Sequence, residues 1–223
     1  MLMMTYPPLD RTYVKPSDTV TSSRVQDGNP EKRFFDLVTV IIIFVLLLSW
    51  LLPILATLVY FSSPGPVFFK QYRTGLNGRI FYCYKFRSMY VFGPEEFKQA
   101  HRNDPRITKI GRWLRKTNLD ELPQFLNVLM GDMSLVGPRP HPLPLDAKYR
   151  NEIPDYVKRY HVTPGMTGLA QAKGLRGITD HPLKMKHRVK YDLFYQKHRS
   201  LALDLAICWW TIVSMSKGNE NAL

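Results

Sequence analysis

The most constraining feature of the sequence is an apolar segment at 37–61, in which 25 consecutive residues carry no charge. A straight helix of this length reaches about 37 Å, at about 1.5 Å per residue. The hydrocarbon core of a bilayer is about 30 Å thick, so the segment is long enough to span it. The sequence therefore predicts a membrane helix, which we place at 32–62.

Two features argue against a simple straight span. Pro53 lacks an N–H group, so the carbonyl of Ser49 loses its helical partner, although the Ser49 hydroxyl can bond a carbonyl one turn back. Positive charge on both flanks favours both ends staying on the cytoplasmic side. The flanking basic residues are Lys32 and Arg33 before the segment, and Lys70, Arg73, Arg79, Lys85 and Arg87 after it. We expect a re-entrant helix broken near Ser49 and Pro53, with a straight anchor as the alternative.

The rest of the chain has the composition of one folded domain. Its 223 residues are enough for a single globular core. A hydrophobic content of 45% and a mean hydropathy of −0.21 exclude a disordered chain and a polytopic membrane protein. Two cysteines, Cys83 and Cys208, form neither a disulfide framework nor a four-cysteine zinc site. The six histidines show no metal-ligand spacing, so we expect no zinc.

Charge is unevenly distributed along the sequence. The chain carries 31 Lys and Arg against 18 Asp and Glu, a net charge of +13. Residues 65–118 hold twelve basic and three acidic residues, and residues 140–199 hold twelve and five. Between these blocks, residues 119–139 form a short acidic island with Asp120, Glu121, Asp132 and a single Arg139. Carboxylates inside a basic field indicate phosphate chemistry better than they indicate a general polyanion binder.

The residue patterns predict an α+β fold that is mainly helical. Residues 1–31 form a polar tail, 63–217 a small cytoplasmic domain and 218–223 a C-terminal tail. A short β-hairpin is expected around Gly75 and Gly78, with strands at 67–69 and 80–86. Helical patterns follow at 110–116 and 181–198. The apolar stretch at 201–215 contains two tryptophans and Asp204, which suits either an amphipathic helix at the membrane interface or a core helix.

The clearest helical period covers 119–130 and carries the candidate site. Its apolar positions form one face: Leu122, Phe125, Leu126, Leu129 and Met130. We expect Asn118 or Asp120 to cap its start and Gly131 to end it. Asp120 and Glu121 then lie in the first turn, where free N–H groups stabilise negative charge, and simple capping is the alternative to catalysis. Because adjacent helical residues point about 100° apart, one carboxylate can hold a divalent ion while the other faces a substrate.

Arginines surround this acidic pair in the sequence and are candidates for phosphate binding: Arg87, Arg112, Arg115 and Arg139. The alternative for each is a solvated surface charge. Arg139 departs most from that alternative, because Pro138 and Pro140 on either side make a stiff loop that would fix its direction.

Seven ordered stretches resemble the bacterial sugar transferases, which are monotopic polyprenyl-phosphate phosphoglycosyl transferases. They are Lys32-Arg33-Phe34-Phe35-Asp36, Ser63-Pro64-Gly65-Pro66-Val67-Phe68-Phe69-Lys70-Gln71, Tyr84-Lys85-Phe86-Arg87-Ser88-Met89, Asn103-Asp104-Pro105-Arg106, Leu119-Asp120-Glu121-Leu122-Pro123-Gln124, Gly131-Asp132-Met133-Ser134-Leu135-Val136-Gly137-Pro138-Arg139-Pro140 and Pro164-Gly165-Met166-Thr167-Gly168. Each stretch alone is a weak signal. Together, in this order, they make a specific resemblance that extends from Lys32 to about Lys217, about five-sixths of the chain.

The resemblance implies a two-step transfer of a sugar-1-phosphate. Asp120 would attack the β-phosphate of a UDP-sugar and release UMP, and undecaprenyl phosphate would then accept the phosphosugar. Glu121 would ligate Mg²⁺ or Mn²⁺, and Arg115, Arg139 and, less directly, Arg87 would bind phosphate. The implied location is the cytoplasmic face of the bacterial inner membrane, among membrane lipids. Downstream glycosyltransferases would use the product for exopolysaccharide, capsule or O-antigen assembly, and no nucleic acid is expected as a partner.

The sequence also departs from the family pattern. The family breaks its membrane helix at an adjacent Ser-Pro, whereas Trp50 follows Ser49 here. Residues 171–176 differ from many relatives, and 176–180 look closer to the glucose-type members. Two rival functions stay open at this point: a basic nucleic-acid-binding protein at the membrane, and a non-catalytic scaffold. The first predicts tight, salt-sensitive binding of DNA or RNA and indifference to Asp120. The second predicts membrane binding without release of a nucleotide.

Overall fold

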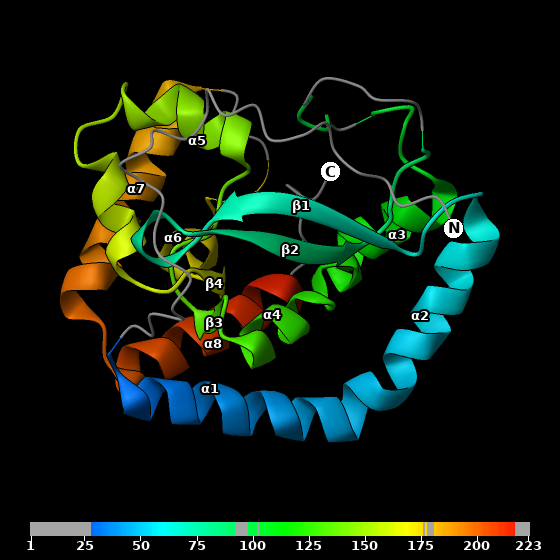
Figure 1. The fold of residues 1–223 in the computed structure, drawn as a ribbon, viewed down its shortest axis with the longest axis horizontal. Helices are drawn as coiled ribbons and strands as arrows, with labels where there is room; N and C mark the ends of the chain where they lie inside the picture. Colours follow the sequence, from blue (N-terminus) through cyan, green and yellow to red (C-terminus); the bar gives the residue numbers. More distant parts are fainter. Residues whose placement is uncertain (1–27, 92–97, 102, 176, 178–180, 217–223) are drawn as a thin grey trace.

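A computed structural model of the chain describes residues 28–91, 98–101, 103–175, 177 and 181–216. Within them the fold is mainly helical with a short antiparallel hairpin, as the sequence predicts (Figure 1). The predicted tails at 1–31 and 218–223 lie outside the described residues, apart from 28–31. Helix α1 begins at Pro30, two residues before the predicted start, because Asn29 accepts a hydrogen bond from the Lys32 N–H and Pro30 occupies the first turn.

The N-terminal apolar segment is one bent helical unit. It consists of α1 (Pro30–Ile43), a π-helical segment (Phe44–Leu48) and α2 (Ser49–Ser62), and it is long and apolar enough to cross a membrane. α1 and α2 meet at a sharp bend (Figure 1). The bend follows from Pro53, which cannot donate to the Ser49 carbonyl, and from the wider π-helical turn before it. The Ser49 hydroxyl donates to the Val45 carbonyl at 3.0 Å, which confirms its predicted local role.

The predicted hairpin is confirmed, with longer strands than expected. β1 (Phe68–Thr74) pairs antiparallel with β2 (Ile80–Phe86), in a register that places Phe68 opposite Phe86 and Thr74 opposite Ile80. Asn77 and Gly78 both have positive φ, which the tight turn requires. On β2 the alternation of the strand turns Phe81, Cys83 and Lys85 to one face.

Helix α4 (Gln124–Met130) covers the free edge of β2 through a single buried side chain. The Asn127 amide donates to the Tyr82 carbonyl at 2.6 Å and accepts from the Tyr84 N–H at 3.0 Å. Asn127 therefore takes the place of a third strand at this edge. This contact ties the helix that follows the acidic pair to the strand that carries Lys85.

The helix predicted at 119–130 is wrong in its first part. The chain leaves α3 (Lys109–Thr117) through Asn118 in a left-handed conformation, makes a 3₁₀ turn at Leu119–Glu121, and begins α4 only at Gln124. Asn118 thus ends one helix and does not cap the next, because its backbone N–H bonds back to the Arg115 carbonyl. The predicted stop at Gly131 is confirmed by its positive φ.

A second, smaller sheet holds the two Gly- and Pro-rich loops together. β3 (Ser134–Val136) and β4 (Gly165–Thr167) are parallel and short. Their ends approach so closely that a Cβ on Gly165 would lie 2.0 Å from the Gly137 nitrogen. Only glycine fits such an approach of backbone to backbone. The loop that carries Arg139 is therefore fixed at its start by the packing of Gly137 against Gly165.

The remaining helices close the core around these strands. They are α5 (Leu143–Arg150), a 3₁₀ segment (Tyr156–His161), α6 (Leu169–Ala172), α7 (Pro182–His198) and α8 (Leu201–Ser216). One core cluster joins α1, β2, α4, β3, α7 and α8 through Val40, Cys83, Val128, Val136, Tyr195 and Ile207. A buried ion pair adds to it, because Lys32 Nζ lies 2.5 Å from Asp204 Oδ2 and Tyr195 donates to the same carboxylate.

Helix α8 has the two-sided character expected of an amphipathic helix. Asp204 and Ile207 are buried, while a stripe of apolar residues faces outward: Leu201, Leu205, Trp209 and Ile212. The side chain of Trp209 is 64% exposed. The placement of this stripe at a membrane surface stays a prediction.

Candidate active site

The acidic pair lies on the 3₁₀ turn Leu119–Glu121, between the end of α3 and the start of α4. Three basic side chains converge on it from different elements. Lys85 comes from β2, Arg115 from the last turn of α3, and Arg139 from the loop after β3. Lys85 and Arg139 are more than fifty residues apart in the sequence, with Arg115 between them. The fold brings all three side chains to one place.

Glu121 is held by two of these cations. Lys85 Nζ lies 2.6 Å from Glu121 Oε1, Arg139 Nη1 donates to Oε2 at 3.2 Å, and Arg139 Nη2 donates to Oε1. Burial pushes the pKa of Glu121 upward, but the charges and hydrogen bonds of Arg139 and Lys85 outweigh it and leave the pKa well below its ordinary value. Glu121 is therefore an ionised carboxylate at any ordinary pH.

Asp120 has the opposite electrostatic environment. Its side chain is buried, and no described residue donates a hydrogen bond to its carboxylate. Burial raises the pKa of Asp120, and the nearby positive charge of Lys85 opposes the rise while Glu121 adds to it. The expectation that a helix start would stabilise this charge is not met, because the residue precedes the helix and is buried. Asp120 keeps its carboxylate oxygens free of competing donors.

Arg115 and Arg139 both lie where the sequence predicts, beside the pair. Arg115 is half-buried, and its Nε donates to the Ser88 hydroxyl at 2.8 Å. Burial lowers the pKa of Arg115, and the negative charge of Asp120 is the largest opposing influence. The two terminal nitrogens of this guanidinium donate no hydrogen bond to any residue that the structure describes. They are therefore available to bind an anion.

Arg87 is not brought to the acidic pair. It is buried at the end of β2, where its Nη2 donates to the carbonyls of Val59 at 3.1 Å and Ser63 at 2.5 Å. Val59 lies in the last turn of α2 and Ser63 directly follows that helix, so Arg87 binds carbonyls at the C-terminal end of α2. The pKa of Arg87 is lowered by burial, with no contribution from the acidic pair. The geometry gives Arg87 a structural role at the end of the membrane helix and supplies no support for the predicted phosphate contact.

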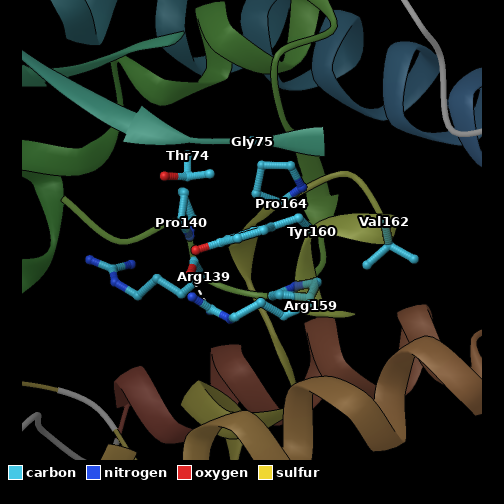
Figure 2. Close-up of a pocket in the computed structure, with 9 residues that line it drawn as sticks. Thr74, Gly75, Arg139, Pro140, Arg159, Tyr160, Val162 and Pro164 are labelled. Carbon is cyan, nitrogen blue, oxygen red and sulfur yellow. Dashed lines mark hydrogen bonds between the residues drawn. The ribbon is translucent and has the colours of Figure 1, made fainter. Parts of the chain in front are cut away.

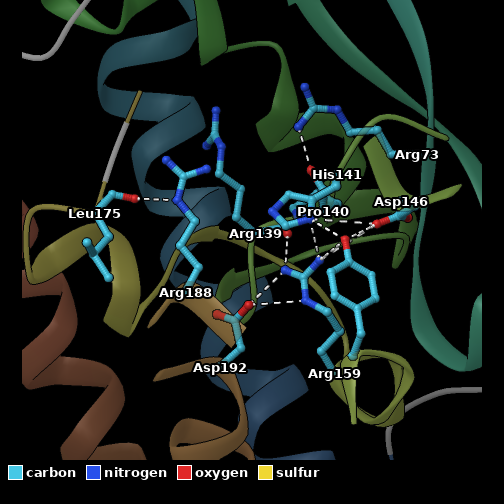
Figure 3. A network of polar contacts seen from close by, with 10 residues as sticks. Arg73, Arg139, Pro140, His141, Asp146, Arg159, Leu175, Arg188 and Asp192 are labelled. Carbon is cyan, nitrogen blue, oxygen red and sulfur yellow. Dashed lines mark hydrogen bonds and ion pairs between the residues drawn. The ribbon is translucent and has the colours of Figure 1, made fainter. Parts of the chain in front are cut away.

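Hydrogen bonds hold the backbone of the Arg139 loop, which its prolines predict to be stiff. Buried arginines hold its backbone carbonyls: Arg159 Nη2 donates to the Arg139 carbonyl at 2.6 Å, and Arg73 Nη1 donates to the Pro140 carbonyl at 2.7 Å (Figure 3). A small cavity lies behind the loop, between Thr74 and Tyr160 (Figure 2). At about 10 Å³ it has room for roughly one water molecule, so it is not a sugar pocket.

The acidic pair has the donor atoms that a hard divalent cation prefers. The described residues contain no group of three or more His, Cys, Asp or Glu side chains that could enclose a metal alone. Mg²⁺ is commonly held by one or two carboxylates together with substrate phosphates. Asp120 and Glu121 fit that pattern, because the buried Asp120 carboxylate accepts no hydrogen bond from residues 28–91, 98–101, 103–175, 177 or 181–216. Glu121 can join only when Lys85 or Arg139 turns away from it.

Sequence reasoning missed Lys85, Asn127 and Arg159 as parts of this site. By sequence, Lys85 is identified only as a basic residue that follows the apolar segment. Its position on the inner face of an alternating strand could have indicated that its side chain points toward the core side of the hairpin. Asn127 and Arg159 are buried polar residues whose partners are backbone atoms far along the chain. No local pattern in the sequence reveals such contacts.

Comparison with known proteins identifies close relatives. Residues 28–218 match the model of the family described as "Bacterial sugar transferase". The chain is 48% identical over 182 residues to the UDP-glucose:undecaprenyl-phosphate glucose-1-phosphate transferase of Escherichia coli (strain K12), covering 81% of this chain and 39% of that protein. It is 51% identical over 157 residues to the protein of the same name from Xanthomonas campestris pv. campestris, covering 70% and 32%.

A shorter relative matches over nearly its whole length. The exopolysaccharide production protein PSS of Rhizobium leguminosarum bv. phaseoli is 46% identical over 188 residues, which cover 82% of this chain and 94% of that protein. The chain therefore spans well under half of the E. coli and Xanthomonas relatives and almost all of the Rhizobium one. These matches confirm the resemblance seen in the sequence motifs.

Proposed function

This chain belongs to the bacterial sugar transferase family, and we propose that it transfers a sugar-1-phosphate from a UDP-sugar to undecaprenyl phosphate, releasing UMP. UDP-glucose is the proposed donor, since the E. coli and Xanthomonas relatives are named for it. One observation carries the proposal above the others. Lys85, Arg115 and Arg139 converge on the adjacent carboxylates Asp120 and Glu121, which is the arrangement that phosphoryl transfer to a carboxylate needs.

In the first step, a carboxylate oxygen of Asp120 attacks the β-phosphorus of the donor, which carries the sugar. The bond from that phosphorus to the bridging oxygen breaks, and UMP leaves with the electron pair. In the second step, a phosphate oxygen of undecaprenyl phosphate attacks the same phosphorus, and the bond to Asp120 breaks. The carboxylate is regenerated and the product is a polyprenyl-diphosphate sugar. Within the part of the chain that the structure describes, no hydrogen bond competes for the Asp120 carboxylate, which suits it to this nucleophilic role.

The basic side chains lower the barrier by neutralising phosphate charge. A carboxylate is a poor nucleophile toward an anionic diphosphate unless that charge is compensated. Arg139 and Lys85, which grip Glu121 here, are within reach of phosphate oxygens held beside Asp120, and Arg115 lies next to the same carboxylate. Glu121 and Asp120 would hold a Mg²⁺ or Mn²⁺ ion, which supplies further charge neutralisation when bound.

The membrane segment would place this site at the lipid surface. We propose that the bent unit of α1 and α2 enters one leaflet and returns, and that the outward stripe of α8 lies at the headgroup level of the same cytoplasmic face. The product would then pass to membrane glycosyltransferases that extend an exopolysaccharide, capsule or O-antigen type of glycan. A covalent intermediate suits this setting, because a soluble donor and a lipid acceptor can use one site in turn.

The test is UMP release by the detergent-solubilised protein with Mg²⁺, with and without undecaprenyl phosphate. The donors to compare are UDP-glucose, UDP-galactose and UDP-N-acetylgalactosamine. We expect release that needs lipid, is fastest with UDP-glucose, and stops when EDTA is added. Release from none of these donors would contradict the proposal and favour a scaffold. Salt-sensitive binding of DNA that ignores Asp120→Asn would favour the nucleic-acid-binding alternative.

A further inference from the structure

Arg139 reaches the acidic pair from a loop whose backbone is fixed by a second arginine. Arg159 lies on the 3₁₀ segment Tyr156–His161, and its side chain is almost fully buried. Figure 3 shows its guanidinium between the Arg139 loop and α7. We propose that Arg159 is a positioning residue for phosphate binding, which acts by fixing the main chain of Arg139. The proposal rests on the function proposed above, in which Arg139 binds the donor's diphosphate.

The contacts of Arg159 use every side of the guanidinium. Nη2 donates to the Arg139 carbonyl at 2.6 Å and to Asp192 Oδ2 at 2.8 Å, and Nε donates to the same Asp192 oxygen at 3.1 Å. Nη1 lies 2.7 Å from His141 Nδ1. Nη1 also donates to the Tyr156 hydroxyl at 3.4 Å. Asp192 thus anchors Arg159 on α7, and Nη2 carries the contact to the Arg139 carbonyl. Such a planar fork cannot be reproduced by a lysine.

Few backbone rotations are left to the loop that carries Arg139. Pro138 and Pro140 fix φ on both sides of Arg139, and the Pro140 carbonyl is held by Arg73. The contact from Arg159 removes the rotation that would still turn the Arg139 peptide. With its backbone fixed, the Arg139 side chain leaves the loop toward Glu121. Because a displacement of about 1 Å at a positioned group can cost about 100-fold in rate, this anchor bears directly on activity.

The distinguishing prediction is that Arg159 works only through Arg139. Arg159→Lys keeps the buried positive charge beside Asp192 but loses the fork that spans to the loop. We expect it to weaken UDP binding and to lower kcat/KM for UMP release by about 10- to 100-fold. In an Arg139→Ala background the same substitution should change either quantity by less than about twofold, since the group being positioned is gone.

A matched control separates this role from general stabilisation. Arg33→Lys removes a similar fork, which donates to the carbonyls of Val128 and Leu129 at the end of α4. The effect of Arg33→Lys on UDP binding and on kcat/KM for UMP release should be equal in the wild-type and Arg139→Ala backgrounds. Asp192→Asn is the second probe, because it loosens the anchor of Arg159 while leaving Arg159 in place. It should show the same dependence on Arg139 if Arg159→Lys does not fold.

Two readouts make the outcomes distinct. Calorimetric binding of UDP tests the positioning of Arg139, and UMP release tests the reaction. Equal losses from Arg159→Lys with and without Arg139 in both readouts would overturn the positioning role while leaving the transferase function intact. If UDP binding shows the expected dependence of Arg159→Lys on Arg139 but the wild-type protein releases no UMP, the proposed function is wrong and the positioning role stands. Wild-type protein that neither binds UDP nor releases UMP would overturn both.

Discussion

At the scale of single residues, two neighbouring carboxylates differ because of what surrounds them. Glu121 accepts hydrogen bonds from Lys85 and Arg139, which hold it ionised. Asp120 is buried, accepts no hydrogen bond from the described residues, and has a raised pKa. The same basic residues face both groups, so the difference arises from hydrogen bonding and burial. This division supports one carboxylate as a fixed charge and the other as the reacting group.

Asp120→Asn should abolish turnover without unfolding the protein. We expect UMP release to fall by at least about 10³-fold, because an amide cannot serve as the nucleophile. Asp132→Asn is the matched control: it makes the same change in the same acidic island, at a residue outside the cluster of basic side chains, and should leave turnover near the wild-type level. A folded Asp120→Asn protein that still turns over would contradict the assignment.

The raised pKa of Asp120 also predicts how stability depends on pH. A carboxyl group whose pKa is higher in the folded state favours folding when it is protonated, and that contribution is lost as pH rises through the folded pKa. In buffer with EDTA, Asp120→Asn should therefore melt at about the wild-type temperature in acid and above it at neutral pH. Thermal melts across this range test the sign. A variant that melts below wild type at neutral pH would show that the ionised carboxylate stabilises the fold.

At the scale of elements, Asn127 is expected to join α4 to the hairpin. Asn127→Leu removes both hydrogen bonds and leaves the Tyr82 carbonyl and Tyr84 N–H buried without partners. Each such orphan costs about 1–3 kcal/mol, so we expect a loss of about 2–5 kcal/mol in unfolding free energy. Chemical denaturation measures it. Asn151→Leu, at an exposed position after α5, is the control and should cost less than about 0.5 kcal/mol.

The bend between α1 and α2 sets where the two ends of the membrane segment lie. If the segment returns to its side of entry, cysteines placed at Glu31 and Lys70 lie on the cytoplasmic side together. A membrane-impermeant maleimide should then label neither position in intact spheroplasts and both after permeabilisation. Cys208→Ser removes the half-buried native thiol from the background, and Cys83 is buried. Labelling of one position alone in intact cells would indicate a straight span.

The elements also show what the sequence could and could not predict. The hairpin, the stop at Gly131 and the bend near Pro53 depend on local chemistry and were predictable. The start of α4 was misplaced because Asn118 ends α3 in a left-handed turn, which competes with its use as a cap. Asn127 and Arg159 could not be assigned, because their partners lie far along the chain and only the fold brings them together.

At the scale of the whole molecule, the membrane segment is fastened to the domain at both ends. Lys32 near the start of α1 pairs with the buried Asp204 of α8, and Arg87, directly after β2, binds the carbonyls of Val59 and Ser63 at the end of α2. Buried contacts therefore join the bent helix to the domain at both of its ends.

Breaking the first of these fastenings should destabilise the whole protein. Lys32→Met leaves the Asp204 carboxylate buried without its cation, and we expect a loss of about 3–5 kcal/mol. Adding Asp204→Asn removes the uncompensated charge and should recover a large part of that loss. Melting temperatures of the two single variants and the double variant measure the coupling. Additive losses would show that the pair does not act as a unit.

The two ion pairs of Glu121 have a consequence for how the proposed donor would bind. Before any phosphate arrives, Lys85 and Arg139 already face a partner anion inside the protein. When the donor binds, its diphosphate would replace the Glu121 carboxylate as the partner of these two cations. This differs from binding to basic side chains that have only solvent ions as partners. An exchange releases fewer bound counterions from solution, so donor affinity should fall only shallowly with ionic strength despite the net charge of +13. In the proposed function, Glu121 would therefore act as an internal counterion that competes with solvent anions for Lys85 and Arg139.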